Sequence, residues 1–173
     1  SGGREHALTF SISKSNKVEK IYCIPGNAGT SELAENISLD INDFKAVYEF
    51  LKKNNVNFVV VGPEDPLVNG IVDYLEKLGI KVFGPNKIAS QLEGSKIFTK
   101  KLCKKYNIPT AEFGIFENAD DSYRYIDNAK HPLVIKADNL AAGKGVYICR
   151  EKNESYLAVK EIFDGKFGTA KNI

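Results

Sequence analysis

Residues 56–66, VNFVVVGPEDP, decide the fold of this chain. The mostly apolar run from Val56 to Val61 is typical of a β-strand that is buried on both faces, as the strands of parallel sheets are. Apolar residues on either side of this strand recur at helical spacing, at positions 44, 47, 48 and 51 and again at 71, 74, 75 and 78. Strands that alternate with helices predict βαβ units and a parallel, doubly wound sheet.

The same alternation covers the first half of the chain. We expect a further helix over residues 4–14 and short strands over residues 20–24 and 80–83. The helix at 4–14 opens directly on a glycine loop, so we expect its preceding strand to lie before Ser1. The prediction is an α/β N-terminal domain over residues 1–90, built on a doubly wound parallel sheet that lacks its first strand.

The pattern changes between about residues 86 and 110, where we place the domain boundary. Residues 87–106 are expected to form a helix, which Pro109 ends. After it we expect strands near 112–116, 133–137 and 146–150, and helices near 119–129 and 154–163. Two of these strands flank a Gly-rich loop in the manner of a hairpin. The second domain, residues 91–173, is therefore predicted to differ in kind from the first.

Composition excludes several classes of protein. With 43% hydrophobic and 27% charged residues among 173, the chain is too apolar for intrinsic disorder. It has no apolar run long enough to span a membrane, and its polar start does not fit a signal peptide. A net charge of +2 gives no argument for nucleic acid as a partner. Because the chain begins at Ser1 and contains no Met, we expect it to be an internal fragment.

The cysteines do not indicate a metal site or a nucleophile. Cys23, Cys103 and Cys149 are odd in number and far apart, without a C-x-x-C pair or a nearby histidine at ligand spacing. We expect reduced, mostly buried thiols, as in a cytosolic protein.

A first candidate site lies in the loops that follow the parallel strands, because ligands of doubly wound sheets bind outside the carboxyl ends of the strands. Gly2 and Gly3 precede a helix, whose N-terminus favours an anion such as phosphate. Asn27 offers amide hydrogen bonds, and Glu64 offers a carboxylate to sugar hydroxyls or to an amine. These loops predict a phosphorylated, hydroxylated and amino-bearing small molecule. The alternative for each loop alone is an ordinary tight turn.

A second candidate site lies in residues 132–150, PLVIKADNLAAGKGVYICR. A strand ends in Lys136, a loop of small residues leads to Gly143, Lys144 and Gly145, and a second strand begins at Val146. Loop amides and the two lysines would surround a polyphosphate. The spacing is not that of a Walker loop, because a strand and not a helix follows. The alternative is a hairpin with a flexible glycine turn and exposed lysines.

Six blocks in this order carry a resemblance to a known family. They are SGGREHAL (1–8), PGNAGT (25–30), VGPEDPLVNGIVDYL (61–75), VFGPNKIASQLEGSKIFTK (82–100), IPTAEF (108–113) and PLVIKADNLAAGKGV (132–146). Together they resemble the phosphoribosylamine–glycine ligases, or glycinamide ribonucleotide synthetases, of the ATP-grasp superfamily. The resemblance implies an enzyme of de novo purine synthesis. In that family ATP and Mg²⁺ convert glycine to glycyl phosphate, and the amine of 5-phosphoribosylamine displaces the phosphate.

The resemblance also implies roles for single residues. On the phosphoribosylamine side it implies substrate contacts at Gly2, Gly3, Arg4, Asn27, Pro63 and Glu64. On the ATP side it implies phosphate contacts at Lys96, Lys136, Gly143, Lys144 and Gly145. It implies no metal ligand in this chain, since the acidic Mg²⁺ ligands and the glycine site are expected after Ile173. Small-molecule substrates, no nucleic acid or membrane partner, and a cytoplasmic location follow from the same resemblance.

Two positions depart from the family's pattern, and two other functions stay open. Asn139 stands where the family usually has Gly, and Asp65 stands where it usually has a small residue. The chain is expected to be inactive alone, because the rest of the active site would lie downstream. One alternative is another ATP-grasp ligase or carboxylase. The other is a nucleotide-binding module that has lost its chemistry.

Overall fold

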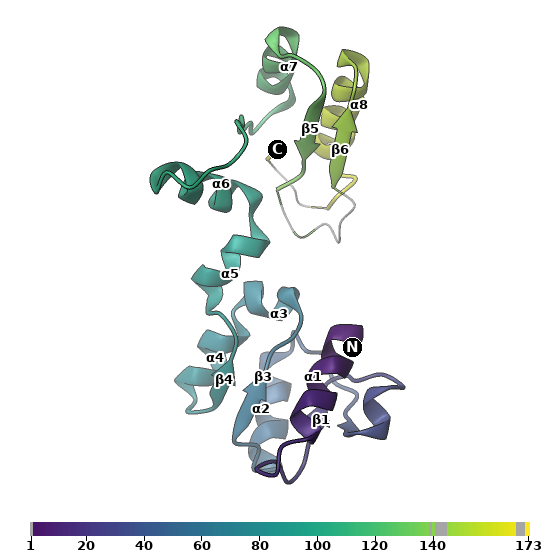
Figure 1. Ribbon diagram of the computed structural model, residues 1–173, viewed down its shortest axis with the longest axis vertical. Coiled ribbons are helices and arrows are strands. Elements are labelled where there is room, and N and C mark those ends of the chain that lie inside the picture. Colours follow the sequence, from purple (N-terminus) through teal and green to yellow (C-terminus); the bar gives the residue numbers. More distant parts are fainter. Residues whose placement is uncertain (1, 139, 141–144, 169–171) are drawn as a thin grey trace. The chain divides into compact units, whose positions relative to one another are not determined.

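The computed structural model describes residues 2–138, 140, 145–168 and 172–173. The chain divides into two compact units, Ser1–Ser90 and Gln91–Ile173 (Figure 1). The strands pair in parallel in the first unit and form an antiparallel hairpin in the second. Each unit is described by itself below.

Two pairs of parallel strands form the centre of the first unit. β1 (Tyr22–Cys23) pairs with β2 (Glu35–Asn36), and β3 (Phe58–Val60) pairs with β4 (Lys81–Phe83). The predicted parallel α/β class is confirmed. Among the described residues these strands form two separate pairs and not one continuous ladder.

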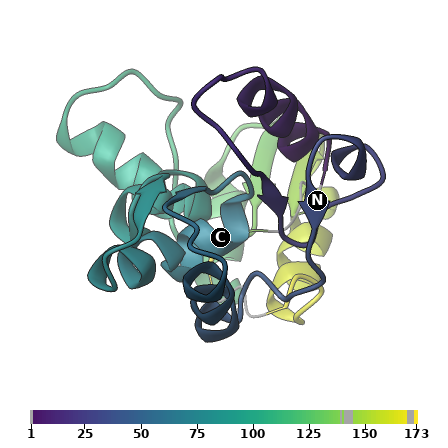
Figure 2. The ribbon, with the colours of Figure 1, turned by 90° about the horizontal axis from the view of Figure 1, so that it is seen from below.

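Four α-helices and one 3-10 helix surround these strands. They are α1 (Gly3–Ser13), η1 (Thr30–Glu32), α2 (Phe44–Lys53), α3 (Glu64–Asn69) and α4 (Ile71–Lys77). α1 and η1 lie side by side in both views (Figures 1 and 2). The short helix α3 was not expected from the sequence. It ends at Gly70, whose φ of +98° is left-handed and costs little only for glycine.

The core of the first unit lies on one face of the β3–β4 pair. Val47 and Leu51 of α2 pack there against Ile71, Val72 and Leu75 of α4. This burial explains the helical spacing of the apolar residues in both segments.

The opposite face of the β3–β4 pair is open within the described residues. Phe58 is 53% exposed and Phe83 is 67% exposed. The expectation that residues 56–61 are buried on both faces was therefore wrong. The run is apolar on both faces, but α2 and α4 cover only the face that carries Val59 and Val82.

The second unit is an antiparallel hairpin backed by helices. β5 (Leu133–Lys136) pairs with β6 (Val146–Cys149), while α7 (Ala119–Asn128) and α8 (Lys152–Phe163) pack on one face of the hairpin (Figure 1). Ile135, Cys149 and Ile162 belong to this core. The expected hairpin and both helices are confirmed.

Three sequence expectations needed correction. The helix expected over 87–106 is two helices, α5 (Lys87–Gly94) and α6 (Lys96–Lys105), because the Ser95 side chain caps the second. Residues 112–116 do not form a strand, and within the described part of the chain Phe116 exchanges backbone hydrogen bonds with Ile173. Of the three free cysteines, Cys149 alone is buried, and the other two are half-buried. No helix among the described residues is long and apolar enough to cross a membrane.

The core of the first unit generates a stability prediction. Leu75 is fully buried, so Leu75→Ala should lower the free energy of unfolding by about 2–5 kcal/mol through lost contacts and a cavity. Leu78→Ala is the matched control at the end of the same helix, since Leu78 is 42% exposed, and it should cost roughly 0.5 kcal/mol or less. Urea unfolding of the full-length protein measures both. Equal losses would contradict the assignment of the core.

Candidate functional site

The N-terminus of α1 joins two loops that lie far away in the sequence. Arg4 Nη1 donates a hydrogen bond of 2.9 Å to the carbonyl oxygen of Gly62, and it lies 3.2 Å from Glu64 Oε2. On the other side, Asn27 Nδ2 donates to the carbonyl oxygen of Gly2 over 3.3 Å. The loops after β1 and β3 thus meet at the first turn of α1, and four of the predicted site residues come together there.

A capping interaction fixes this first turn. Gly2 is the N-cap of α1 in an extended conformation, and its N–H donates to Glu5 Oε2 over 2.6 Å. Partial burial works to raise the pKa of Glu5, but the hydrogen bond from the Gly2 N–H leads the interactions that hold it below the usual value. Sequence reasoning missed Glu5. Its signal was available, because a Glu at the third helical position is half of a capping box.

Two glycines let α1 approach the loops closely. A Cβ on Gly29 would lie 2.7 Å from the His6 ring, and a Cβ on Gly62 would lie 2.6 Å from Glu5 Oε1. Both distances are shorter than real Cβ contacts, so a side chain on either glycine would displace the His6 ring or the Glu5 carboxylate from its place. A Cβ on Gly3, by contrast, would meet nothing within 4 Å. The predicted residue Gly3 therefore borders open space at the helix start.

A buried hydroxyl holds the loop that carries Asn27. Thr30 is fully buried, and its N–H donates to Asn27 Oδ1 over 3.0 Å while its hydroxyl donates to Asn36 Oδ1 over 2.8 Å. The Asn36 side chain in turn donates to the carbonyl oxygen of Asn27 over 2.7 Å. These bonds fix the loop backbone, so the Asn27 amide group points its Nδ2 toward α1. Neither Thr30 nor Asn36 was singled out from the sequence.

The loop after β3 continues into α3. Pro63 is the N-cap of α3 with extended backbone, and Glu64 is the first helical residue. The Glu64 carboxylate is about half exposed, so it keeps access to solvent beside Arg4. Asp65, the departure from the family pattern, accepts a hydrogen bond from Asn42 Nδ2 over 2.7 Å. Asp65 thus contacts Asn42, whereas Glu64 contacts Arg4 of α1.

The second candidate site lies at the end of β5. Lys136 is the last residue of this strand and pairs with Val146 of β6. Its exposed side chain shares one face of the hairpin with Val134, Val146 and Ile148, all of them exposed. This face is turned away from the core that α7 and α8 cover. The hairpin therefore presents a flat apolar surface with one lysine at its edge.

Lys96 is brought to the same end of the hairpin by polar contacts. It is the first residue of α6, and the cap of that helix, Ser95, donates to the carboxylate of Asp138 over 3.0 Å. The N–H of Ile97 donates to the same carboxylate over 3.0 Å. Asp138 follows Lys136 by two residues, so the start of α6 contacts the chain just beyond the end of β5. Sequence reasoning named both lysines but missed Asp138.

The glycine loop of the second site is only partly described. Asn139, Gly143 and Lys144 lie outside the described residues. Gly145 is buried, and its carbonyl oxygen accepts a hydrogen bond from the Ala137 N–H over 2.8 Å, which extends the hairpin by one step. In the described part of the chain, no three His, Cys, Asp or Glu side chains come together as a metal site would require.

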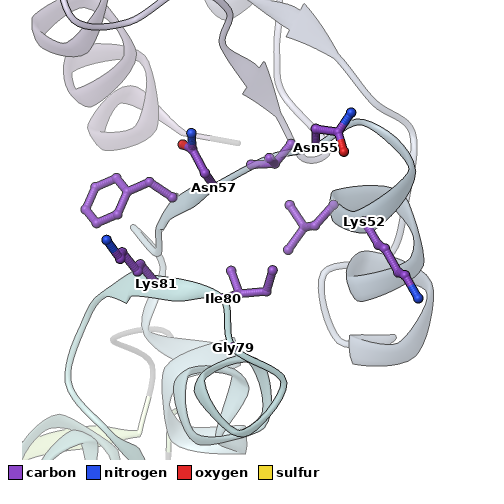
Figure 3. A pocket seen from close by; sticks show the side chains of 9 residues that line it. Lys52, Asn55, Asn57, Gly79, Ile80 and Lys81 are labelled. Atoms are coloured by element: carbon purple, nitrogen blue, oxygen red, sulfur yellow. The ribbon is translucent and has the colours of Figure 1, made fainter.

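An open cavity of about 720 Å³ lies at the other end of the β3–β4 pair (Figure 3). It is bordered by the amino ends of both strands and by the end of α2, and its lining includes Phe58, Ile80, Lys52 and Lys81. It is therefore separated from Gly62 and Glu64, which follow the carboxyl end of β3. We assign it no part in the candidate site.

Parallel strands followed by an antiparallel hairpin, with a lysine on the hairpin and a Gly-rich loop after it, define a protein of the ATP-grasp class. The chain belongs to the phosphoribosylglycinamide synthetase family. Residues 1–93 match the family's N domain, and residues 94–173 match its ATP-grasp (A) domain.

Known relatives agree with this assignment. Over 170 residues the chain is 46% identical to the phosphoribosylamine–glycine ligase of Clostridium acetobutylicum and 49% identical to that of Agrobacterium fabrum, covering 95% and 98% of this chain but 41% and 40% of theirs. The chain thus spans about two fifths of the length of these relatives. The crystal structure of the Thermotoga maritima ligase is similar with a TM-score of 0.77 at 33% identity, over 99% of this chain and 40% of that one.

A carboxylase shares the fold at lower identity. The biotin carboxylase domain of the Hydrogenobacter thermophilus 2-oxoglutarate carboxylase has a TM-score of 0.75 at 19% identity, over 99% of this chain and 42% of that one. Such a likeness shows a common architecture only.

The loop that carries Asn27 generates a prediction on glycine. Gly26 has a φ of +82°, and a Cβ there would lie 2.1 Å from Asn36 Oδ1. Gly79 has a nearly equal φ of +81° but open space around it. Gly79→Ala should thus report backbone strain alone, on the order of 1 kcal/mol, and Gly26→Ala should lower the free energy of unfolding by clearly more. Urea unfolding of both variants measures the two changes in free energy. Equal losses of unfolding free energy would show that the Asn36 side chain moves aside without cost.

Proposed function

We propose that the protein containing this chain joins glycine to 5-phosphoribosylamine at the expense of ATP. The glycine carboxylate takes the γ-phosphoryl group of ATP and leaves ADP. The amine of phosphoribosylamine then attacks the acyl carbon, and inorganic phosphate departs as the amide forms. The observation that carries the proposal is the meeting of Arg4, Asn27 and Glu64 at the start of α1, in a chain that belongs to a family of such synthetases.

The first unit supplies groups suited to a sugar phosphate with an amine. Gly3 borders open space beside the first turn of α1, and Arg4 offers a positive charge to a phosphate there. The half-exposed Glu64 offers a carboxylate to ribose hydroxyls or to the amine. Asn27 stands on the opposite side of the helix start, beside Gly2. We propose that Gly2, Gly3, Arg4, Asn27, Pro63 and Glu64 bind phosphoribosylamine.

The second unit supplies groups suited to a nucleotide. The exposed face of Val134, Val146 and Ile148 fits a flat purine ring, and Lys136 at its edge fits a phosphate. Lys96 enters from the start of α6 at the same end of the strand. We propose that these lysines, together with Gly143, Lys144 and Gly145, hold the ATP phosphates. When bound, ATP supplies the phosphoryl group that activates the carboxylate.

Magnesium belongs to this proposal as a charge that neutralises the ATP phosphates. The described residues offer no cluster of acidic ligands, so we assign the Mg²⁺ ligands to the part of the protein beyond this chain. Under this proposal the substrates of the protein are three small molecules, phosphoribosylamine, glycine and ATP. No nucleic acid or membrane is among its proposed partners. We propose that the reaction takes place in the cytoplasm, where purine precursors are made.

Another ATP-grasp ligase or carboxylase is the second candidate. N5-carboxyaminoimidazole ribonucleotide synthetase of Thermus thermophilus shares the fold at 17% identity and a TM-score of 0.68, which shows a common architecture only. The first unit discriminates between the candidates, because the match to the synthetase N domain covers Arg4, Asn27 and Glu64. The third candidate is a module that has lost its chemistry. In such a module the second unit would still bind a nucleotide, and the first unit would bind no phosphoribosylamine.

A first test concerns Glu64. In the full-length enzyme, Glu64→Ala should raise the KM for phosphoribosylamine by about tenfold or more, because a charged hydrogen bond worth about 1.5–3 kcal/mol is lost. The KM for ATP should stay near the original value. Asp65→Ala is the matched control, since this neighbouring carboxylate is bound to Asn42. A phosphoribosylamine KM that is equal in Glu64→Ala and the original protein would remove Glu64 from the site.

A second test concerns Lys136. Lys136→Ala should weaken ADP binding and reduce turnover by about tenfold or more, while the melting temperature changes little because the side chain is exposed. Lys136→Arg should recover little, since a planar fork does not replace a compact ammonium. Lys81→Ala serves as control, because Lys81 is an exposed lysine at the cavity of the first unit. A Lys136→Ala protein that melts far lower yet binds ADP normally would make Lys136 a structural residue.

A further inference from the structure

Asp138 is the polar centre of the contact between α6 and the hairpin. Its two carboxylate oxygens accept from the Ser95 hydroxyl over 3.1 and 3.0 Å, and Oδ1 also accepts from the Ile97 N–H over 3.0 Å. The donors flank Lys96 on both sides in the sequence. The carboxylate thus binds the first turn of α6, to which Lys96 belongs.

We propose that Asp138 is a positioning residue that holds Lys96 beside Lys136, so that both lysines address the same phosphate group. This inference rests on the proposed nucleotide site and adds to it a residue whose role is to align, without contacting the nucleotide. Its support comes from the strand, the helix and the charges of the contact.

The strand sets the direction of the Asp138 side chain. Successive side chains of an extended chain alternate between faces. Ala137 is fully buried in the core, so Lys136 and Asp138 on either side of it point away from the core. The hydrogen bond from the Ala137 N–H to Gly145 continues the hairpin up to this point, and the Asp138 N–H donates to the carbonyl oxygen of Asn172 over 3.0 Å. The backbone under the carboxylate is therefore fixed on both sides.

Among the described residues, hydrogen bonds to Asp138 hold both neighbours of Lys96 at the first turn of α6. The first residues of this helix are half-buried and none is fully buried, so polar contacts contribute to where the helix begins. Further along the described helix, Thr99 donates to the carbonyl oxygen of Leu92 and Lys100 donates to Thr110. The contact of Ser95 and Ile97 with Asp138 is thus the described tie between the hairpin and the turn that carries Lys96.

The charges of the contact assign it to positioning and exclude a direct phosphate site at the helix start. A helix N-terminus attracts anions through its free N–H groups and its dipole. At α6 this place is taken by the Asp138 carboxylate and by the Ser95 hydroxyl, which accepts the Phe98 N–H over 3.0 Å. A phosphate nearby would then meet the lysine side chains, which the carboxylate keeps aligned, and not the N–H groups of Ile97 and Phe98.

The experiment is a double-mutant cycle in the full-length protein, with ADP as the probe. Calorimetry measures the Kd for ADP in Asp138→Ala, Lys96→Ala and the double variant, and melting temperatures are recorded for each. Asp138→Ala should raise the Kd by about tenfold, as expected for one misaligned charged contact. It should add less than about twofold when Lys96 is already Ala, because effects that act through one group are not additive. Asp164→Ala, an exposed carboxylate at the end of α8, is the control.

The conservative variant separates alignment from folding. Asp138→Asn keeps an oxygen that accepts from the Ile97 N–H, so it should fold and bind ADP with an intermediate Kd. If Asp138→Ala does not fold, the Kd of Asp138→Asn for ADP provides the test instead. An unchanged Kd in Asp138→Asn with a lower melting temperature would make the contact purely structural.

Other outcomes locate a failure. If Asp138→Ala weakens ADP binding equally with and without Lys96, Asp138 does not act through Lys96 and the inference is overturned. If Lys96→Ala and Lys136→Ala weaken ADP binding but both Asp138 variants bind normally, the nucleotide site stands and only the role of Asp138 is lost. If both lysine variants bind ADP normally, the proposed nucleotide site itself is wrong, and the inference falls with it.

Discussion

The hydrogen bonds that join the first turn of α1 to the loops after β1 and β3 are the constraint on which the first candidate site depends. Arg4 donates to Gly62 on one side, and Gly2 accepts from Asn27 on the other. Without these bonds the loops would be independent turns at the ends of separate strand pairs. The small size of Gly29 and Gly62 favours this contact, because a Cβ at either position would displace the His6 or Glu5 side chain of α1.

The second unit uses the same physical device with the charges exchanged. In the first unit a helix start offers a cation, Arg4, to the carbonyl and carboxylate groups of a loop. In the second, a carboxylate at a strand end, Asp138, receives the donors of a helix start. Both arrangements fix exposed side chains by polar contacts, since a hydrophobic core cannot position groups that must remain accessible to a ligand. The described residues of both candidate sites therefore lie outside the two hydrophobic cores.

Much of the fold was predictable from the sequence because helical and strand periodicity depend on local burial. The spacing of apolar residues predicted α2 and α4 and the strands β3 and β4, all of which form. The errors have local causes. Ser95 interrupts an otherwise continuous helical pattern by capping α6. Residues 112–116 do not form the expected strand, and among the described residues Phe116 pairs instead with Ile173. Periodicity carries no information on either event, since both depend on distant or polar partners.

The sequence by itself determined the family of this protein, through blocks that resemble known members, and its parallel and antiparallel halves, through residue type and spacing. It also singled out the loops and lysines of the two candidate sites. The tertiary structure alone decided which loops meet, which oxygen Arg4 contacts, and that Asp138 joins the start of α6 to the end of β5. Such contacts link residues some forty to sixty positions apart, and they arise only when packing of the helices on the strands brings the segments together.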